Sequence, residues 1–202
     1  MVEPYLRQSP LASLHIQGET TLPSTADYQL LEHPYRGLIN IRGDIQDAKF
    51  GAAIKKATRT DLPKQPNAVS GTAKGTHIIW LGPDEWLVVT KPGGEERMVS
   101  SLTKSLDGLH ASVTDISESR TVIGLSGTRA LDILEKGCSL DLYPQVFTVG
   151  QCAQTRLSRA NVILHHTGIA KAKDVSFYEL YVLRSFAGYL WQWILDAGKE
   201  FE

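Results

Sequence analysis

The stretch His77–Thr90, HIIWLGPDEWLVVT, determines how the rest of the chain is organised. Two apolar runs rich in β-branched and aromatic residues flank Gly82-Pro83-Asp84-Glu85, a composition typical of a turn. The pattern predicts a β-hairpin. Because the runs are apolar at nearly every position rather than at alternate ones, we expect both faces of the hairpin to be covered. Trp80 and Trp86 flank the turn and should be among its largest buried side chains.

The composition is that of an ordinary globular chain. Its 202 residues are 42% hydrophobic and 21% charged, which indicates one large domain or two small fused ones. A net charge of −1 without a basic cluster argues against nucleic-acid or membrane partners. The first residues lack the features of a secretory signal, and no apolar run is long enough to span a bilayer. We therefore expect a cytoplasmic protein with its two cysteines, Cys138 and Cys152, reduced.

The elements around the hairpin predict a ferredoxin-like unit. A strand at 38–42 precedes a helix that opens at Asp44 or Asp47, both acceptable N-caps. After the hairpin come a helix at 95–106 and a strand at 111–116. The order strand, helix, strand, strand, helix, strand is that of a split βαβ fold.

The chain then repeats this order in part. A strand at 121–125 leads through a glycine into a second helix, and a hairpin of 152–157 with 162–167 follows. An added strand at 175–183 precedes the closing helix. We interpret this as an internal duplication. The predicted fold class is α+β, with duplicated ferredoxin-like (βαββαβ-type) units at about 36–116 and 117–202 that together form one domain, 36–202.

The leading segment, residues 1–35, has little periodic pattern. Only 11–16 resembles a short strand, yet the segment contains too many apolar residues for a solvated tail. We expect an arm that lies on another surface, a second chain being one candidate.

The closing helix, from Ser185 to about Lys199, is apolar around most of its circumference. Such a helix must be covered on more than one side. Deep burial within the domain and contact with another subunit both explain it, and Trp191 and Ile194 are the residues we would place in an interface.

Candidate catalytic groups do not assemble into a complete active site. Ser126 lies at a strand-to-helix turn but lacks the G-x-S-x-G spacing of a nucleophile elbow. His165 and His166 are consecutive in a strand, so their side chains should face opposite ways and are poorly placed to bind one zinc ion. Asp115 and Glu118 near Arg120 fit either a catalytic cluster or a turn with a surface ion pair, and we favour the turn.

Several motifs nevertheless resemble one family. They are the turn Leu81–Leu87, the segment Asp115–Val122 with Gly127, the run Lys136–Leu142, and the later Phe147 and Gln151–Thr155. Together they are similar to the gamma-subunit family of bacterial heterotetrameric sarcosine oxidase, over most of the chain from Leu38 onward and also at 9–14. The residues that carry the resemblance, as structural positions, are Gly82, Pro83, Asp84, Glu85, Trp86, Arg120, Gly127, Gly137 and Cys138.

The resemblance implies a subunit of an oxidoreductase that converts sarcosine to glycine, with hydrogen peroxide and with formaldehyde or 5,10-methylenetetrahydrofolate as products. It implies alpha, beta and delta partner subunits, with FAD and NAD in alpha, FMN in beta and zinc in delta. It implies no catalytic residue, cofactor or metal in this chain, and a fold similar to part of the folate-binding aminomethyltransferases. The alternative is a free-standing tetrahydrofolate-binding or aminomethyl-transferring protein, which would need a carboxylate at a folate pocket.

Overall fold

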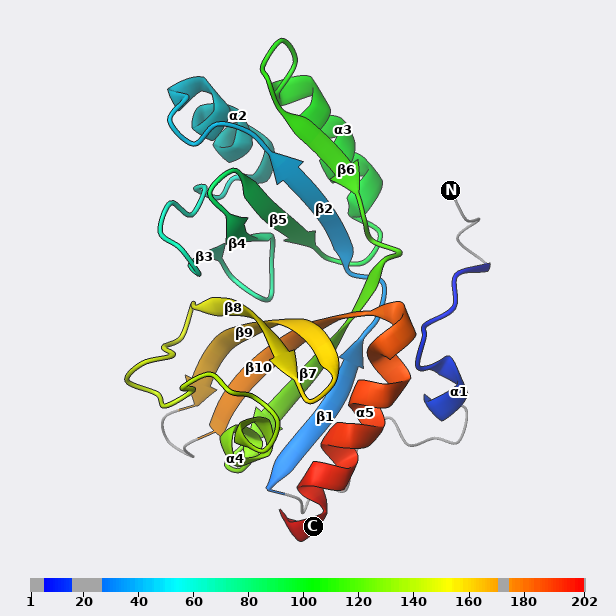
Figure 1. The fold of residues 1–202 in the computed structure, drawn as a ribbon. Helices are drawn as coiled ribbons and strands as arrows, with labels where there is room; N and C mark the ends of the chain where they lie inside the picture. Colours follow the sequence, from blue (N-terminus) through cyan, green and yellow to red (C-terminus); the bar gives the residue numbers. More distant parts are fainter. Residues whose placement is uncertain (1–5, 16–26, 171–174, 202) are drawn as a thin grey trace.

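The computed structural model describes residues 6–15, 27–170 and 175–201. Two five-stranded antiparallel sheets lie face to face, and each carries helices on its outer side (Figure 1). The layers are therefore helix, sheet, sheet, helix. Among the described helices, none combines the length and the apolar character needed to cross a membrane.

The first sheet has the strand order β3-β4-β5-β2-β6 and carries α2 and α3. Its elements are β2 (Gly37–Arg42), α2 (Ala48–Thr58), β3 (Val69–Gly71), β4 (His77–Gly82), β5 (Glu85–Thr90), α3 (Glu95–Ser105) and β6 (Ser112–Asp115). The order β4-β5-β2-β6 is the ferredoxin-like arrangement that the sequence predicts, with β3 added at the edge. Asp47 is the N-cap of α2, since its carboxylate accepts from the backbone N–H of Lys49 at 2.8 Å.

The predicted hairpin is confirmed, and both of its faces are covered. Ile78, Trp86 and Val88 pack against α2 and α3, whereas Ile79, Leu87 and Val89 pack against the other sheet. Trp86 is fully buried, as expected. Trp80, its cross-strand partner, is only partly buried and lies at the turn end of the hairpin.

The second sheet has the order β1-β7-β10-β9-β8 and carries α4 and α5. Its elements are β1 (Tyr28–His33), β7 (Arg120–Gly127), α4 (Ala130–Glu135), β8 (Cys152–Leu157), β9 (Ala160–Ala170), β10 (Val175–Leu183) and α5 (Arg184–Gly198), followed by a 3₁₀ turn at Lys199–Phe201. Placing the two orders side by side aligns β8 with β3, β9 with β4, β10 with β5 and β7 with β2.

The duplication is therefore present, but two of its equivalences differ from the expected ones. The hairpin that corresponds to β4 and β5 is β9 with β10, not β8 with β9, so the added strand is β8. The strand that corresponds to β6 is β1, which comes from the beginning of the chain and pairs with β7 along its whole length. The second unit is thus completed by an N-terminal strand.

The assignment of all of residues 1–35 to an arm is accordingly wrong for 28–33, which form an integral strand. The expected strand at 11–16 is also wrong, because residues 12–15 form a short helix, α1 (Ala12–His15). Leu11 is fully buried in the core beneath α5, and Arg7 pairs with Glu95 and Glu118 at 2.7 Å each. The described part of the leading segment therefore lies on its own chain. Residues 16–26 fall outside the described residues.

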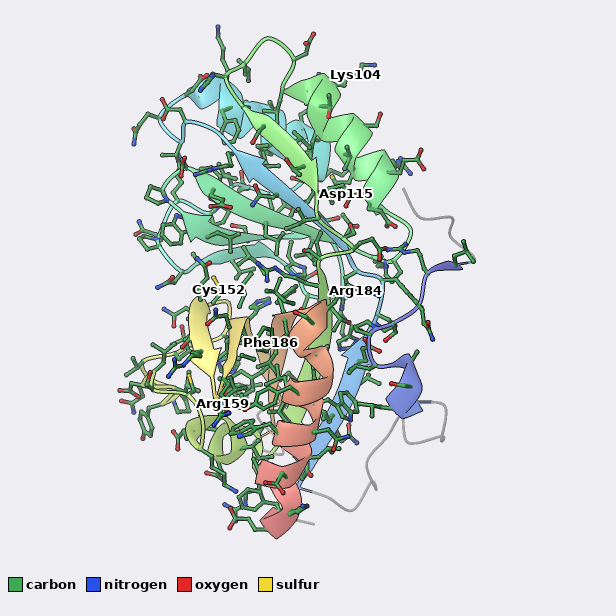
Figure 2. The ribbon with its side chains drawn as sticks, turned by 45° about the vertical axis from the view of Figure 1, so that its right-hand side comes forward. Lys104, Asp115, Cys152, Arg159, Arg184 and Phe186 are labelled. Atoms are coloured by element: carbon green, nitrogen blue, oxygen red, sulfur yellow. The ribbon has the colours of Figure 1, made fainter. Side chains whose placement is uncertain are left out.

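The closing helix is also covered by its own chain. Trp191 and Ile194 are 4% and 0% exposed and belong to the core that α4, α5 and the second sheet share. The interface role expected for these two residues is wrong, because a side chain buried in its own domain has no surface to offer a partner. Two aromatic residues of α5, Phe186 and Tyr189, are instead about two-fifths exposed (Figure 2 labels Phe186).

These positions predict the stability effects of truncating α5. Ile194→Ala should lower the free energy of unfolding by about 2–5 kcal/mol, because it removes a fully buried side chain and leaves a cavity. Phe186→Ala, on the same helix, should change it by less than about 1 kcal/mol. Urea unfolding followed by circular dichroism measures both. Equal effects of the two substitutions would contradict the burial of Ile194.

Candidate functional site

The turn of the hairpin is held by polar contacts to β2. Asp84 accepts from the Arg42 guanidinium at 3.0 Å, and its backbone carbonyl accepts from the N–H of Gly43 at 3.1 Å. Glu85 accepts from the side-chain amide of Asn40 at 2.7 Å. The two carboxylates of the motif thus anchor the β4–β5 turn to the neighbouring strand, which is a structural use.

Trp86 fixes the loop that enters this sheet. Its indole N–H donates to the carbonyl oxygen of Pro63 at 2.9 Å, and its ring lies 5.6 Å from that of Phe50 on α2. A Cβ at Gly43 would come within 2.4 Å of the same Phe50 ring, so a glycine is needed there. The tryptophan is therefore a packing centre between β5, α2 and the 59–68 connection.

The other motif residues also occupy packing positions. Gly127 has φ +139°, and a Cβ there would come within 2.2 Å of the backbone oxygen of Asp27, just before β1, which pairs with β7 at this point. A Cβ at Gly137 would come within 2.6 Å of the Trp193 ring. Cys138 is a free thiol whose Sγ lies 3.8 Å from the hydroxyl of Thr155.

The acidic residues near Arg120 form a turn, as favoured from the sequence, but the ion pairs of this turn do not involve Arg120. Asp115 accepts from the backbone N–H and the hydroxyl of Ser117. Glu118 pairs with Arg7 and Arg184 rather than with Arg120. Arg120 is partly buried, and this burial lowers its pKa. The four residues are not arranged as a catalytic cluster.

A cluster that the sequence does not indicate lies where the two sheets meet. His77 comes from β4, His165 from β9, and Glu179 and Tyr181 from β10. Tyr181 donates its hydroxyl hydrogen to Glu179 Oε2 at 2.7 Å, so His77 must donate Nε2–H to the Tyr181 oxygen at 2.8 Å. Arg36, just before β2, donates to Glu179 Oε1 at 3.1 Å. The cluster thus links both sheets through one buried carboxylate.

Burial sets the protonation of this cluster. It lowers the pKa of His77 and, helped by the neighbouring His77 and His166, lowers that of His165 to about 3. Burial and the nearby Glu179 carboxylate raise the pKa of Tyr181. Both imidazoles are therefore neutral near pH 7, and Glu179 with Arg36 forms an ion pair of zero net charge whose side chains are 7% and 13% exposed.

The residue types also suit a divalent metal, and the geometry allows that to be tested. The ligand atoms of His77, His165 and Glu179 lie within 4.8 Å of one another, and each histidine nitrogen is 3.9–4.0 Å from Glu179 Oε2. Ligands of a tetrahedral zinc ion with bonds of about 2.1 Å lie roughly 3.4 Å apart. Tyr181 and Arg36 already occupy the carboxylate. The arrangement therefore fits a hydrogen-bonded network that joins the sheets better than a metal centre.

His165 and His166 face opposite ways, as predicted. His165 points into the sheet interface, whereas His166 stacks on Tyr178 at 4.7 Å and its Nδ1 lies 2.9 Å from the carbonyl oxygen of Phe147. The two residues that lie with His165, His77 and Glu179, are far from it in the sequence. No local motif therefore signals the cluster.

Comparison with known proteins assigns the family. The model of the sarcosine oxidase, gamma subunit family matches residues 42–200. The chain belongs to the sarcosine oxidase gamma subunit family. Proteins called sarcosine oxidase subunit gamma in Corynebacterium sp. (strain P-1) and in Arthrobacter sp. are each 34% identical to it, over 97% of this chain and 92% of the relative.

Solved structures agree with this membership. The chain matches one from the heterotetrameric sarcosine oxidase of Corynebacterium sp. U-96, with a TM-score of 0.86 and 29% identity, over 97% of this chain and 96% of that one. It also matches the glycine cleavage system aminomethyltransferase T of Bartonella henselae, with a TM-score of 0.71 and 16% identity. That match covers 94% of this chain but 57% of the transferase, and it shows a shared fold.

The buried ion pair gives a testable stability difference. Glu179→Gln leaves the Arg36 guanidinium buried without its counter-charge, so we expect the free energy of unfolding to fall by about 3 kcal/mol. The matched control is Asp84→Asn, which breaks a pair whose side chains are more than half exposed and should cost less than about 1 kcal/mol. Chemical denaturation of both variants measures the difference, and a Glu179→Gln chain as stable as the control would refute the network.

The lowered pKa of His165 predicts acid sensitivity. The unfolded chain takes up a proton near pH 6.5, whereas the folded chain resists it until about pH 3, so the stability is complete above pH 6.5 and decreases as the pH falls. In this window the free energy of unfolding should fall by about 1.4 kcal/mol per pH unit from this residue. His165→Gln should flatten the dependence, and replacing the exposed His110 should not. Unfolding curves collected from pH 7 to pH 4 distinguish these outcomes.

Proposed function

We propose that this chain is the gamma subunit of a heterotetrameric sarcosine oxidase and acts as a structural partner of the subunits that perform the chemistry. The observation that carries the proposal is the match, along nearly the full length of both chains, to a chain of the Corynebacterium sp. U-96 enzyme. Several motif residues support it, because Asp84, Glu85 and Trp86 anchor the hairpin and Gly127 and Gly137 allow close packing in this structure.

The chemistry of the described interior favours this role. The buried carboxylate Glu179 is occupied by Arg36 and Tyr181, and burial keeps His77 and His165 neutral. Burial also raises the pKa of Cys152 to about 12, so its thiol is a poor nucleophile near neutral pH. These groups stabilise the packing of the sheets and are poorly suited to proton transfer or covalent catalysis.

The proposal extends to the partners and their cofactors. The other subunits are alpha, beta and delta, with FAD and NAD in alpha, FMN in beta and zinc in delta. The complex would oxidise sarcosine to glycine with hydrogen peroxide and with formaldehyde or 5,10-methylenetetrahydrofolate. These assignments rest on the family resemblance, as does the cytoplasmic location, which stays a prediction.

Co-expression tests the proposal directly. With the neighbouring subunit genes, the chain should elute from gel filtration in a yellow complex of four different polypeptides that consumes oxygen when sarcosine is added. Omitting only this chain should lower the yield of assembled complex, because the partners then lose a packing surface. The subunit ratio is read from denaturing gels and the flavin from visible absorbance.

The alternative, a free-standing tetrahydrofolate-binding protein, rests on the shared aminomethyltransferase fold. It is tested with the same preparation. A monomer that binds tetrahydrofolate in calorimetry and never enters the four-chain complex would replace the subunit proposal.

A further inference from the structure

A basic pocket lies on the outer side of the first sheet, away from the contact with the second. It has a volume of about 480 Å³ and lies between the C-terminal end of α2, the N-terminal half of α3 and the end of β5. Four of its lining residues are cationic: Lys56 and Arg59 at the end of α2, Lys91 after β5, and Arg97 on α3. We call this set the basic pocket.

The cations of the basic pocket are not neutralised within the described residues. Other basic side chains, such as Arg7, Arg36 and Lys55, are paired with carboxylates. For the four pocket cations, the described ranges contain no carboxylate within ion-pair distance, and each is solvent-exposed. In a chain of net charge −1, four unpaired cations around one pocket form a local concentration of positive charge.

One face of α3 forms a wall of the pocket. Gly94, Arg97, Met98 and Ser101 line the pocket at i, i+3, i+4 and i+7, so they share one face of α3. Glu95 and Glu96 are off that face, and Glu95 is held by Arg7. At the end of α2, Lys55 O accepts from the Arg59 N–H and Ile54 O accepts from the Thr58 hydroxyl. The pocket therefore offers donors and positive charge.

The positive surface continues beyond the pocket. Lys91 also lines a neighbouring pocket of about 400 Å³ that contains the exposed Lys74. In that second pocket Arg36 is already paired with Glu179, and Glu32 is also among the lining residues, so the uncompensated charge is concentrated at the basic pocket and Lys74. Exposed lysine and arginine side chains bind one small anion weakly, because water and salt screen each contact. A segment with several carboxylates can contact many of them at once.

We propose that the basic pocket binds an acidic segment of a partner subunit in the assembled enzyme. The inference rests on the proposed function, because it requires a partner chain. Carboxylates of that segment would pair with Lys56, Arg59, Lys91 and Arg97, and the hydroxyls of Thr76 and Ser101 would supply further donors. The contact contributes orientation and association rate as well as affinity, as electrostatically complementary interfaces do.

The test uses charge reversal in the co-expressed complex. In the double variant Lys56→Glu/Arg97→Glu, two attractive contacts become repulsive, so the chain should dissociate from the complex about ten times more readily than wild type. The neutral pair Lys56→Gln/Arg97→Gln should give an intermediate effect. The fraction of this chain that remains on an affinity-tagged partner is measured by quantitative gels as salt is raised from about 0.1 M to about 0.5 M, over which the screening length falls from about 10 Å to roughly 4 Å.

The matched control carries the same change in net charge on the same two helices. Lys49→Glu/Lys104→Glu reverses two exposed cations outside the pocket, and Lys104 lies near the far end of α3 (Figure 2). It should behave as wild type. Circular dichroism and thermal unfolding of all variants show that each is folded.

The outcomes separate the possibilities. Wild-type retention of the Lys56→Glu/Arg97→Glu chain, or equal loss in the control, overturns the inference and leaves the proposed function intact. Stabilisation of the chain by inorganic pyrophosphate, together with unchanged retention of the variant, reassigns the pocket to a small anion. Failure of the wild-type chain to enter any complex removes both the inference and the proposed function.

Discussion

The contact between the inner faces of the two sheets is the constraint on which the rest of the structure depends. Each sheet has apolar residues on both faces, so separating the two units would expose an apolar inner face of each to water. Leu38, Ile79, Leu87 and Val89 of one sheet meet Val122, Ile163 and Tyr181 of the other. The Arg36–Glu179 pair lies beside this contact, and its strength depends on the exclusion of water by the apolar residues.

This constraint explains what the sequence could predict. The β4–β5 hairpin and the first ferredoxin-like unit were predictable because their signals are local: a Gly-Pro-Asp turn, continuous apolar strands and two capped or acidic helix starts. The equivalences in the second unit were not, because they depend on pairing between distant strands. In β1 the residue types do not follow the two faces, since Leu31 is exposed and Glu32 is buried, and only its partner β7 makes it a strand.

The same distinction between local signals and contacts between distant strands applies to the histidine and glutamate side chains. The opposite directions of His165 and His166 follow from strand geometry, and the sequence was sufficient. The cluster of His77, His165 and Glu179 requires knowledge of which strands from the two sheets face each other, which no local spacing provides. Trp191 and Ile194 show a second limit of prediction from the sequence. The apolar surface of α5 indicates that other residues pack against it. Whether these residues belong to the same chain or to another subunit depends on the positions of the neighbouring strands and α1, which composition does not give.

The distribution of charge then separates two parts of the molecule with different roles. In the interior, the buried carboxylate of Glu179 is matched by Arg36 and Tyr181. This pairing links the two sheets and leaves the carboxylate little capacity to engage a substrate. On the outer side of the first sheet, Lys56 and Arg97 remain unmatched among the described residues. A chain whose central buried carboxylate is already paired and whose surface carries unmatched charge is better suited to bind another protein than to transform a small molecule.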